Sequence, residues 1–92
     1  MVDGPGYVYV LELVEGRFYV GHTTDLYRRI CQHFSGTGAV FTKTFKPLKV
    51  ASVTEGGLAL EKATFAATAA THGWDNTRGA GYTKVQMKAP DW

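Results

Sequence analysis

Residues 7–21 read Tyr-Val-Tyr-Val-Leu-Glu-Leu-Val-Glu-Gly-Arg-Phe-Tyr-Val-Gly, and this stretch decides the fold. The runs 7–14 and 17–21 are dense in β-branched and aromatic residues, which favour strands. Glu15-Gly16 lies between the two runs and is typical of a tight turn. The stretch therefore predicts a β-hairpin.

The length of the hairpin loop determines which side chains share a face of the sheet. A two-residue loop places Tyr9 and Tyr19 on opposite faces. A three-residue loop ending at a left-handed Gly16 places Leu13 opposite Arg17. Tyr9 and Tyr19 then lie diagonally on one face. We favour the second loop, because the opposite face then collects an apolar set: Val8, Val10, Phe18 and Val20.

A helical period begins after Thr23, and either Thr23 or Thr24 can cap the helix, with Asp25 in its first turn. We expect Arg29 and His33 on its exposed side. The apolar positions are Leu26, Ile30 and Phe34, with Tyr27 and Cys31 beside them. We expect Cys31 to be a small core residue.

The rest of the chain predicts a connecting stretch over 39–46, a third strand over 48–54 and a second helix over 57–72, which Gly73 ends. In that helix we expect one apolar side: Leu60, Ala63, Ala67 and Ala70. We expect the polar stripe to hold Glu61, Thr64, Thr68 and Thr71. A turn-forming run follows over 75–81. The fold class is therefore α/β, an α+β sandwich with a three-stranded mixed or antiparallel sheet flanked by helices.

A chain of 92 residues has room for one small domain, so we expect a single domain over 1–92, with a motif core over about 7–82 and a tail over 83–92. Cys31 is the only cysteine, which excludes an intramolecular disulfide and suits a reducing compartment. The longest nearly uncharged stretch, 63–74, is shorter than the ~20 apolar residues of a membrane span. Residues 1–6 lack a signal-peptide pattern. We expect a cytoplasmic protein without a membrane partner.

Charge is distributed unevenly along the chain, although the net charge is only +2. Residues 17–49 hold six basic residues against one acid, a net of +5, so the other positions sum to −3. Such an asymmetry favours a basic patch that meets a polyanion.

The order of these features resembles the GIY-YIG nuclease family. Tyr7-Val8-Tyr9 corresponds loosely to the first half of the family name, and Tyr19-Val20-Gly21 corresponds closely to the second half. Tyr19 follows Tyr9 by ten positions, and the helix that follows carries Arg29 and His33. The resemblance covers about residues 7–82 and implies a nuclease fold.

The resemblance also implies a single divalent metal held by one glutamate on a later helix, and Glu61 is the matching position. Glu55 is rejected because it precedes the Gly56-Gly57 break. Asn76 falls where the family's terminal asparagine is expected, and Arg78-Gly79 resembles a short signature of some small members. A zinc site at Cys31 and His33 is excluded, because i and i+2 residues point apart on a helix and no second ligand pair exists.

These residue types suit the hydrolysis of a phosphodiester. Glu61 is a hard oxygen ligand for Mg²⁺, with Mn²⁺ as the other candidate, and Arg29 offers a planar donor fork to a phosphate. Tyr9 and Tyr19 position or activate water, and the sequence does not order their roles. His33 contacts phosphate or relays a proton. We expect the substrate-binding residues to be His22, Arg28, Lys43, Asn76 and Arg78.

We therefore expect a metal-dependent endonuclease that cuts DNA, single-stranded, duplex or branched, with little sequence specificity. Selection would then come from DNA structure, a targeting partner protein or a homodimer. The first alternative is a catalytically silent nucleic-acid-binding module with the same fold, and the second is a protein-interaction domain. Retention of Glu61 argues against a silent module.

Overall fold

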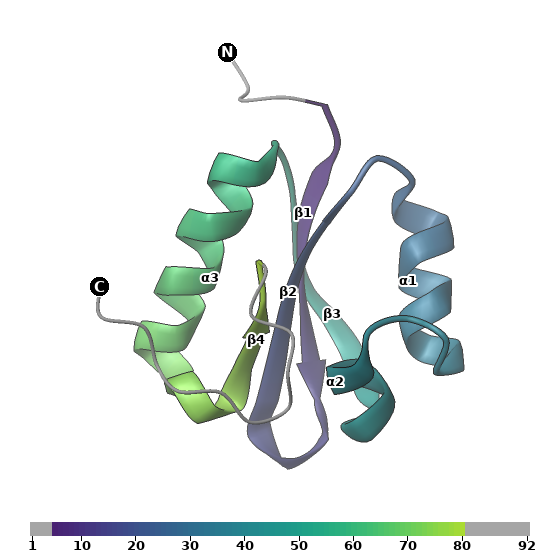
Figure 1. Ribbon diagram of the computed structural model, residues 1–92, viewed down its shortest axis with the longest axis vertical. Helices are drawn as coiled ribbons and strands as arrows, with labels where there is room; N and C mark the ends of the chain where they lie inside the picture. Colours follow the sequence, from purple (N-terminus) through teal and green to yellow (C-terminus); the bar gives the residue numbers. More distant parts are fainter. Residues whose placement is uncertain (1–4, 81–92) are drawn as a thin grey trace.

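A computed structural model describes residues 5–80, which form a mixed four-stranded sheet with helices on both faces (Figure 1). The elements, in chain order, are β1 (Tyr7–Leu13), the 3₁₀ turn η1 (Val14–Gly16), β2 (Arg17–Thr23), α1 (Leu26–Ser35), α2 (Val40–Thr44), β3 (Pro47–Glu55), α3 (Leu58–His72), the 3₁₀ turn η2 (Trp74–Asn76) and β4 (Thr77–Gly79). The predicted fold class is confirmed. The end of the predicted motif core at 82 and the predicted tail, 83–92, lie outside the described residues.

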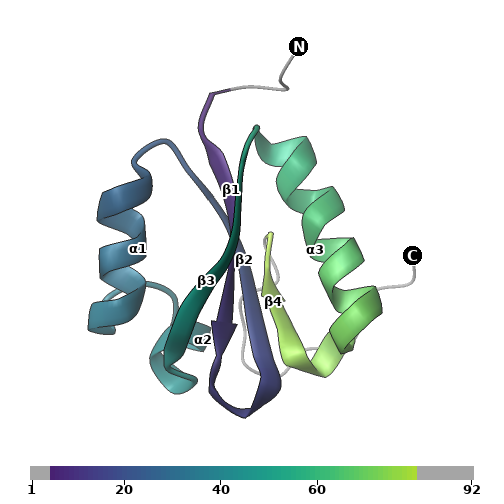
Figure 2. The same ribbon diagram turned by 180° about the vertical axis from the view of Figure 1, so that it is seen from behind.

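The strands lie in the order β3-β1-β2-β4. β1 is antiparallel to both β2 and β3, whereas β4 is parallel to β2. α3 covers one face, and α1 and α2 cover the other; the view from behind shows β3 at the near edge (Figure 2). The prediction of three strands is wrong by one, because the turn-forming run after α3 also contains the short β4.

The hairpin has the three-residue loop that the sequence favoured. Leu13 pairs with Arg17 and Leu11 pairs with Tyr19. Both Glu15 and Gly16 adopt left-handed backbone angles, with φ of 62° and 69°. The rings of Tyr9 and Tyr19 lie on the same face, with centroids 6.4 Å apart.

Each face of the sheet has its own cluster of buried side chains. The cluster under α3 consists of Val8, Val10, Val20, Phe65 and Ala69. The cluster under α1 and α2 consists of Tyr9, Leu11, Leu13, Tyr19 and Phe41. The alternation of side chains along β1 therefore supplies two cores, as period-two patterning requires.

Leu26 and Ile30 of α1 pack against the core as the apolar pattern predicts, but the helix continues its buried side with His33 and not with Phe34. His33 is buried rather than exposed, while Cys31 and Phe34 are exposed. The prediction of Cys31 as a core residue is therefore wrong. Burial of His33 is tolerated because both of its ring nitrogens have hydrogen-bond partners. The N-cap is Asp25, whose side chain accepts from the backbone N–H of Arg28, and neither predicted threonine has this role.

α3 also departs from the prediction, because Phe65 and Ala69 face the sheet whereas Ala63, Ala67 and Ala70 are exposed. Phe65 buries far more apolar area than an alanine, so its position decides which side of the helix packs. Glu61 lies one turn before Phe65 and is half-buried. Glu61, which the sequence placed on the solvent-facing polar stripe, is therefore partly covered.

The segment 39–46, predicted as a connection, contains the short helix α2, which buries Phe41 and Thr42. At the opposite edge, Gly79 has a φ of 125°, and a Cβ there would clash with the backbone of Val20. Glycine thus allows β4 to approach β2 closely. Among the helices described between residues 5 and 80, none has the length and apolar character needed to cross a membrane.

Candidate active site

The outer edge of β2 is covered along only part of its length. β4 pairs with Phe18, Tyr19 and Val20 and then ends at Gly79. From Gly21 onward this edge has no strand beside it among the described residues. Side chains from α1 on one face and α3 on the other can therefore meet around the end of β2.

Gly21 is the residue that makes room at this edge. It pairs with Tyr9 across the hairpin, and a Cβ at Gly21 would clash with the hydroxyl and ring of Tyr9. The missing side chain therefore lets the tyrosine ring lie across β2. This contact explains why a strand interior that favours β-branched residues contains a glycine.

Four of the sequence-predicted residues, one from each of β1, β2, α1 and α3, influence one another electrostatically. The guanidinium of Arg29 interacts with the hydroxyl groups of both Tyr9 and Tyr19 and acts to lower their pKa values. Glu61 acts on the same two hydroxyl groups in the opposite direction. The two hydroxyl groups are therefore within electrostatic range of both a guanidinium and a carboxylate.

Burial nevertheless dominates the protonation of the two tyrosines. Burial raises the pKa of Tyr9 well above its ordinary value, and the neighbouring Tyr19 raises it further. Burial also raises the pKa of Tyr19, against the influence of Arg29. Both hydroxyl groups are therefore protonated at neutral pH.

His33 lies behind Tyr9, with none of its surface exposed. Its Nε2 is 2.6 Å from the Tyr9 hydroxyl oxygen, and its Nδ1 is 2.8 Å from Oγ1 of Thr42. Burial, followed by the charge of Arg29, lowers the pKa of His33 to about 4. The imidazole is therefore neutral at neutral pH, with one nitrogen as donor and the other as acceptor.

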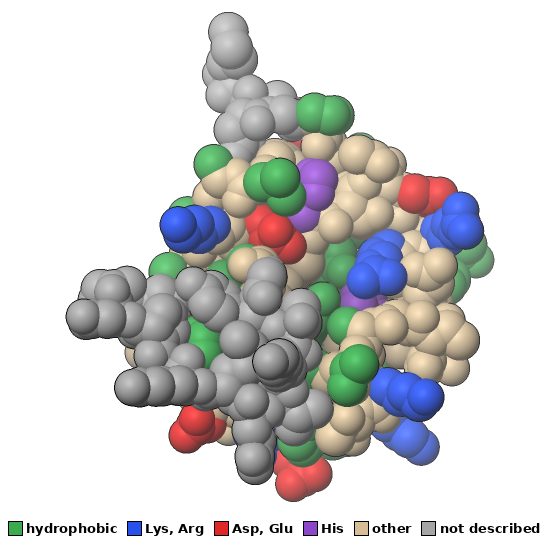
Figure 3. All heavy atoms as spheres, in the orientation of Figure 1, with side chains coloured by type: hydrophobic (Ala, Val, Ile, Leu, Met, Phe, Trp, Pro, Cys, Tyr) green, Lys and Arg blue, Asp and Glu red, His purple; other side chains and the backbone are tan. Residues whose placement is uncertain are grey.

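Glu61 is half-buried in the first turn of α3. Burial raises its pKa, while the charge of His22 and hydrogen bonds from the backbone of Ala80 and His22 act against this rise. Among residues 5–80 no three His, Cys, Asp or Glu side chains gather closely enough to form a metal cage. Glu61 can thus offer a single carboxylate to a cation. Figure 3 shows a carboxylate beside a histidine near the middle of this face, with most of the visible Lys and Arg side chains over α1 and α2.

The other predicted substrate-binding residues lie in different surroundings. His22 is half-buried, and its Nε2 is 3.0 Å from the carbonyl oxygen of Pro5. Arg28 and Lys43 are exposed. Asn76 lies just beyond the last turn of α3, where its amide donates to the carbonyl of His72. That position is the opposite end of α3 from Glu61, so the structure does not bring these two together.

Arg78 pairs with Tyr19 across β2 and β4 but is almost completely buried. Its guanidinium donates to the carbonyl oxygens of Trp74 and Thr77, at 2.6 and 2.7 Å. It also lies over the rings of Phe41 and Trp74. These contacts hold β4 and η2 against the sheet.

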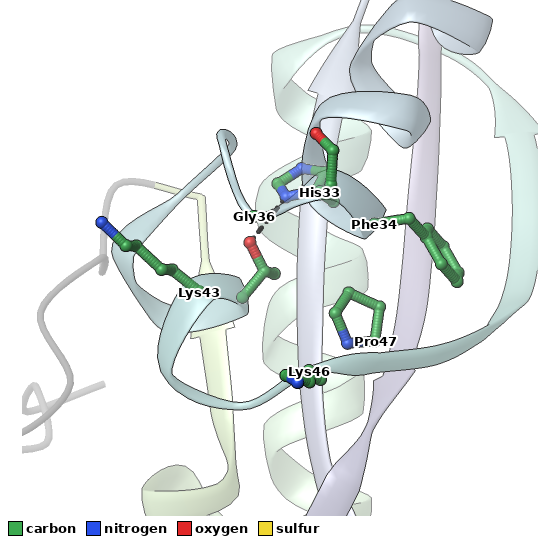
Figure 4. Close-up of a pocket in the computed structure, with 8 residues that line it drawn as sticks. His33, Phe34, Gly36, Lys43, Lys46 and Pro47 are labelled. Carbon is green, nitrogen blue, oxygen red and sulfur yellow. Dashed lines mark hydrogen bonds between the residues drawn. The ribbon is translucent and has the colours of Figure 1, made fainter.

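A hollow of about 290 Å³ lies beside His33 (Figure 4). Its walls come from the end of α1, from α2 and from the start of β3: His33, Phe34, Ser35, Gly36, Thr42, Lys43, Lys46 and Pro47. Sequence reasoning missed Thr42, because it lies in the stretch predicted as a connection and has no titratable group.

Comparison with known families agrees with this arrangement, since residues 5–68 match the model of the GIY-YIG catalytic domain. The chain belongs to the GIY-YIG family. The matched region includes the hairpin, Arg29, His33 and Glu61. The family to which the sequence showed a resemblance is therefore confirmed, and the match is to the catalytic domain of that family.

Relatives of this GIY-YIG chain come from bacteria and archaea. A UPF0213 protein of Streptococcus pneumoniae is 45% identical over 49 residues, which cover 53% of this chain and 50% of the relative. A UPF0213 protein of Cupriavidus pinatubonensis is 47% identical over 53% of this chain and 54% of its own length. One from Halobacterium salinarum is 43% identical over 46% of this chain and 54% of its own length. The chain thus spans about half the length of these curated relatives. No solved structure matches the chain significantly.

Proposed function

We propose that this GIY-YIG chain is a metal-dependent endonuclease that hydrolyses phosphodiester bonds in DNA. The proposal is supported by the electrostatic influence that both Arg29 and Glu61 exert on the hydroxyl groups of Tyr9 and Tyr19, next to the end of β2 that β4 leaves uncovered. Phosphodiester hydrolysis needs an activated water and charge stabilisation around the phosphorus, and these side chains are suited to both tasks.

Arg29 is the proposed phosphate-binding residue. Its guanidinium provides several donors in a plane, which match two phosphate oxygens. Exposed Arg28 and Lys43 would contact the flanking DNA backbone, and His22 would contact substrate beside Glu61. Backbone contacts carry little sequence information, so cleavage would be directed by DNA structure, by a targeting partner protein or by a second copy of the chain.

Glu61 is the proposed metal ligand. A lone carboxylate fits Mg²⁺, which usually keeps several waters and takes phosphate oxygens as further ligands. Mn²⁺ would fit the same oxygen. When bound, the cation would neutralise a phosphate oxygen and stabilise the leaving alkoxide. The half-buried position of Glu61 strengthens its attraction to a cation.

Tyr9 is the proposed contact of the attacking water. Its hydroxyl lies 2.6 Å from Nε2 of neutral His33, so the proton of Tyr9 can move to His33 while Tyr9 takes a proton from water. Tyr9 stays neutral overall in this relay, and Arg29 would stabilise the negative charge that builds up on the Tyr9 oxygen during the transfer. Tyr19, which lies beside Tyr9, would support the water from the same face.

The test is a cleavage assay with labelled single-stranded, duplex and branched DNA in the presence of Mg²⁺, Mn²⁺ or a chelator. The variants are Glu61→Ala and, as a matched control, Glu55→Ala, which removes an exposed carboxylate at the end of β3. We expect Glu61→Ala to lower the cleavage rate about 10³-fold, because it removes the metal ligand. Glu55→Ala should cleave like the unchanged chain.

Equal cleavage by the unchanged chain and Glu61→Ala would contradict the metal assignment. Binding of DNA without cleavage of any substrate would support the alternative of a silent nucleic-acid-binding module. In that case the dependence of affinity on salt would report the number of phosphate contacts.

A further inference from the structure

A line of three hydrogen bonds runs from Tyr9 through His33 to the backbone of α2. Tyr9 and Nε2 of His33 are 2.6 Å apart, and Nδ1 of His33 and Oγ1 of Thr42 are 2.8 Å apart. Oγ1 of Thr42 in turn lies 3.0 Å from the carbonyl oxygen of Ala39. All three side chains in this line are almost completely buried.

The partner of Thr42 decides the direction of the line at the α2 end. A threonine hydroxyl has one proton, and the carbonyl of Ala39 can only accept. Thr42 therefore donates its proton to Ala39 and accepts from His33. This arrangement requires a proton on Nδ1 of His33.

The contacts of Tyr9, at the other end of the line, agree with this direction. Arg29 interacts with the Tyr9 hydroxyl, and a guanidinium can only donate. The oxygen of Tyr9 therefore accepts from Arg29, which leaves its own proton for Nε2 of His33. Because the contact with Thr42 places the ring proton on Nδ1, the unprotonated Nε2 accepts the Tyr9 proton.

We propose that Thr42 is a positioning residue that holds His33 in the tautomer protonated on Nδ1, so that Nε2 remains available to the Tyr9 proton. The tautomer itself follows from the contacts alone. Its catalytic consequence rests on the proposed nuclease function. Thr42 would then determine, without touching substrate, whether His33 can accept the proton that Tyr9 must lose.

The surroundings of His33 hold this geometry in place. A Cβ at Gly38 would lie 2.6 Å from Nδ1 of His33, so the loop before α2 packs directly against the ring. The rings of Tyr9 and Tyr19 lie on its other sides, with centroids 5.5 and 4.9 Å from that of His33. His33 and Thr42 also line the hollow between the end of α1, α2 and the start of β3 (Figure 4).

The first experiment measures the ¹⁵N chemical shifts of the His33 ring in the full chain at neutral pH. We expect Nδ1 to give a protonated signal and Nε2 an unprotonated one. This measurement needs neither DNA nor metal, so it is independent of the proposed nuclease function. A protonated Nε2 in the unchanged chain would overturn the proposal.

Two variants separate the contribution of Thr42 from that of Tyr9. Tyr9→Phe removes the partner of Nε2, and His33 should remain protonated on Nδ1 because Thr42 still accepts. Thr42→Val removes that acceptor, and the proton should shift toward Nε2, whereas Thr42→Ser should preserve the original signals. A proton that moves in Tyr9→Phe, or stays on Nδ1 in folded Thr42→Val, would contradict the role of Thr42. If Thr42→Val does not fold, Tyr9→Phe and Thr42→Ser still decide the question.

Cleavage supplies a second readout. If the unchanged chain cuts DNA, Thr42→Val should lower kcat at least about tenfold with little change in KM, and Thr42→Ser should restore it. An unchanged kcat in Thr42→Val would contradict the catalytic consequence. If the unchanged chain cuts no DNA, the nuclease proposal fails, and the NMR result for the tautomer stands separately.

Discussion

The two faces of the sheet differ in what their buried side chains do. The face under α3 buries only apolar residues from β1 and β2, packed against Phe65 and Ala69. The face under α1 and α2 buries Tyr9 and Tyr19, and hydrogen bonds connect Tyr9 through His33 to Thr42. Alternate residues of the same two strands thus serve different purposes. One face is apolar along these two strands, whereas the other holds the hydrogen-bonded side chains of the candidate site.

The largest effect should come from the apolar face. Phe65→Ala removes a fully buried ring that packs against Trp74 and should lower the free energy of unfolding by about 3 to 5 kcal/mol. Urea unfolding followed by circular dichroism measures this loss. Tyr27→Ala is the control, because Tyr27 is 83% exposed and its removal should change stability by less than about 0.5 kcal/mol. A small effect of Phe65→Ala would contradict the view that the apolar face under α3 supplies stability.

The next largest effect should come from the face under α1 and α2, where Tyr9 lies. Gly21→Ala places a methyl group against the ring of Tyr9 and should displace its hydroxyl. A displacement on the order of 1 Å in a catalytic group lowers cleavage about 100-fold. Steady-state cleavage of DNA measures the loss, and Glu55→Ala again serves as the control. Undiminished cleavage by Gly21→Ala would show that the position of Tyr9 over β2 is not required.

The comparison also predicts a dependence of stability on pH. Because burial lowers the pKa of His33 to about 4, the unfolded chain binds a proton at higher pH than the folded chain. The contribution of neutral His33 to the free energy of unfolding is fully present above about pH 6.5 and is lost as the pH falls toward 4. From pH 7 to pH 5 the loss should be about 2 kcal/mol.

Urea midpoints at the two pH values measure this loss. His33→Gln should be less stable at pH 7 but should show a smaller change between pH 7 and pH 5. An equal pH dependence in the unchanged chain and in His33→Gln would assign the effect to other groups.

The smallest effect should come from the outer side of α1. Cys31 is exposed, so Cys31→Ser should change the free energy of unfolding by less than about 0.5 kcal/mol and leave cleavage unchanged. Thermal unfolding and the DNA cleavage assay measure both properties. A large destabilisation would instead support the core position that the helical pattern alone predicted.

The sequence was most informative where local patterning and turn chemistry act together. The hairpin, its three-residue loop and the shared face of Tyr9 and Tyr19 follow from alternation and from Glu15-Gly16, and the structure agrees. It was less informative about α1 and α3, where several sides of each helix looked suitable for burial. In α1 the buried side includes His33, because its ring forms a hydrogen bond with Tyr9 of β1. In α3 the buried side includes Phe65, because its ring packs against valines of β1 and β2. Both partners are distant in the chain.

The sequence by itself determined the two strands, the sorting of their side chains onto two faces and the set of residue types for phosphodiester chemistry. These features depend on neighbours within a few positions, where backbone geometry imposes a period. Only the tertiary structure decided that β4 stops at Gly79, that Glu61 lies within electrostatic range of the two tyrosines and that Thr42 supports His33. Those contacts join residues from different elements. Packing of the whole sheet and its helices, rather than any local pattern, sets their distances.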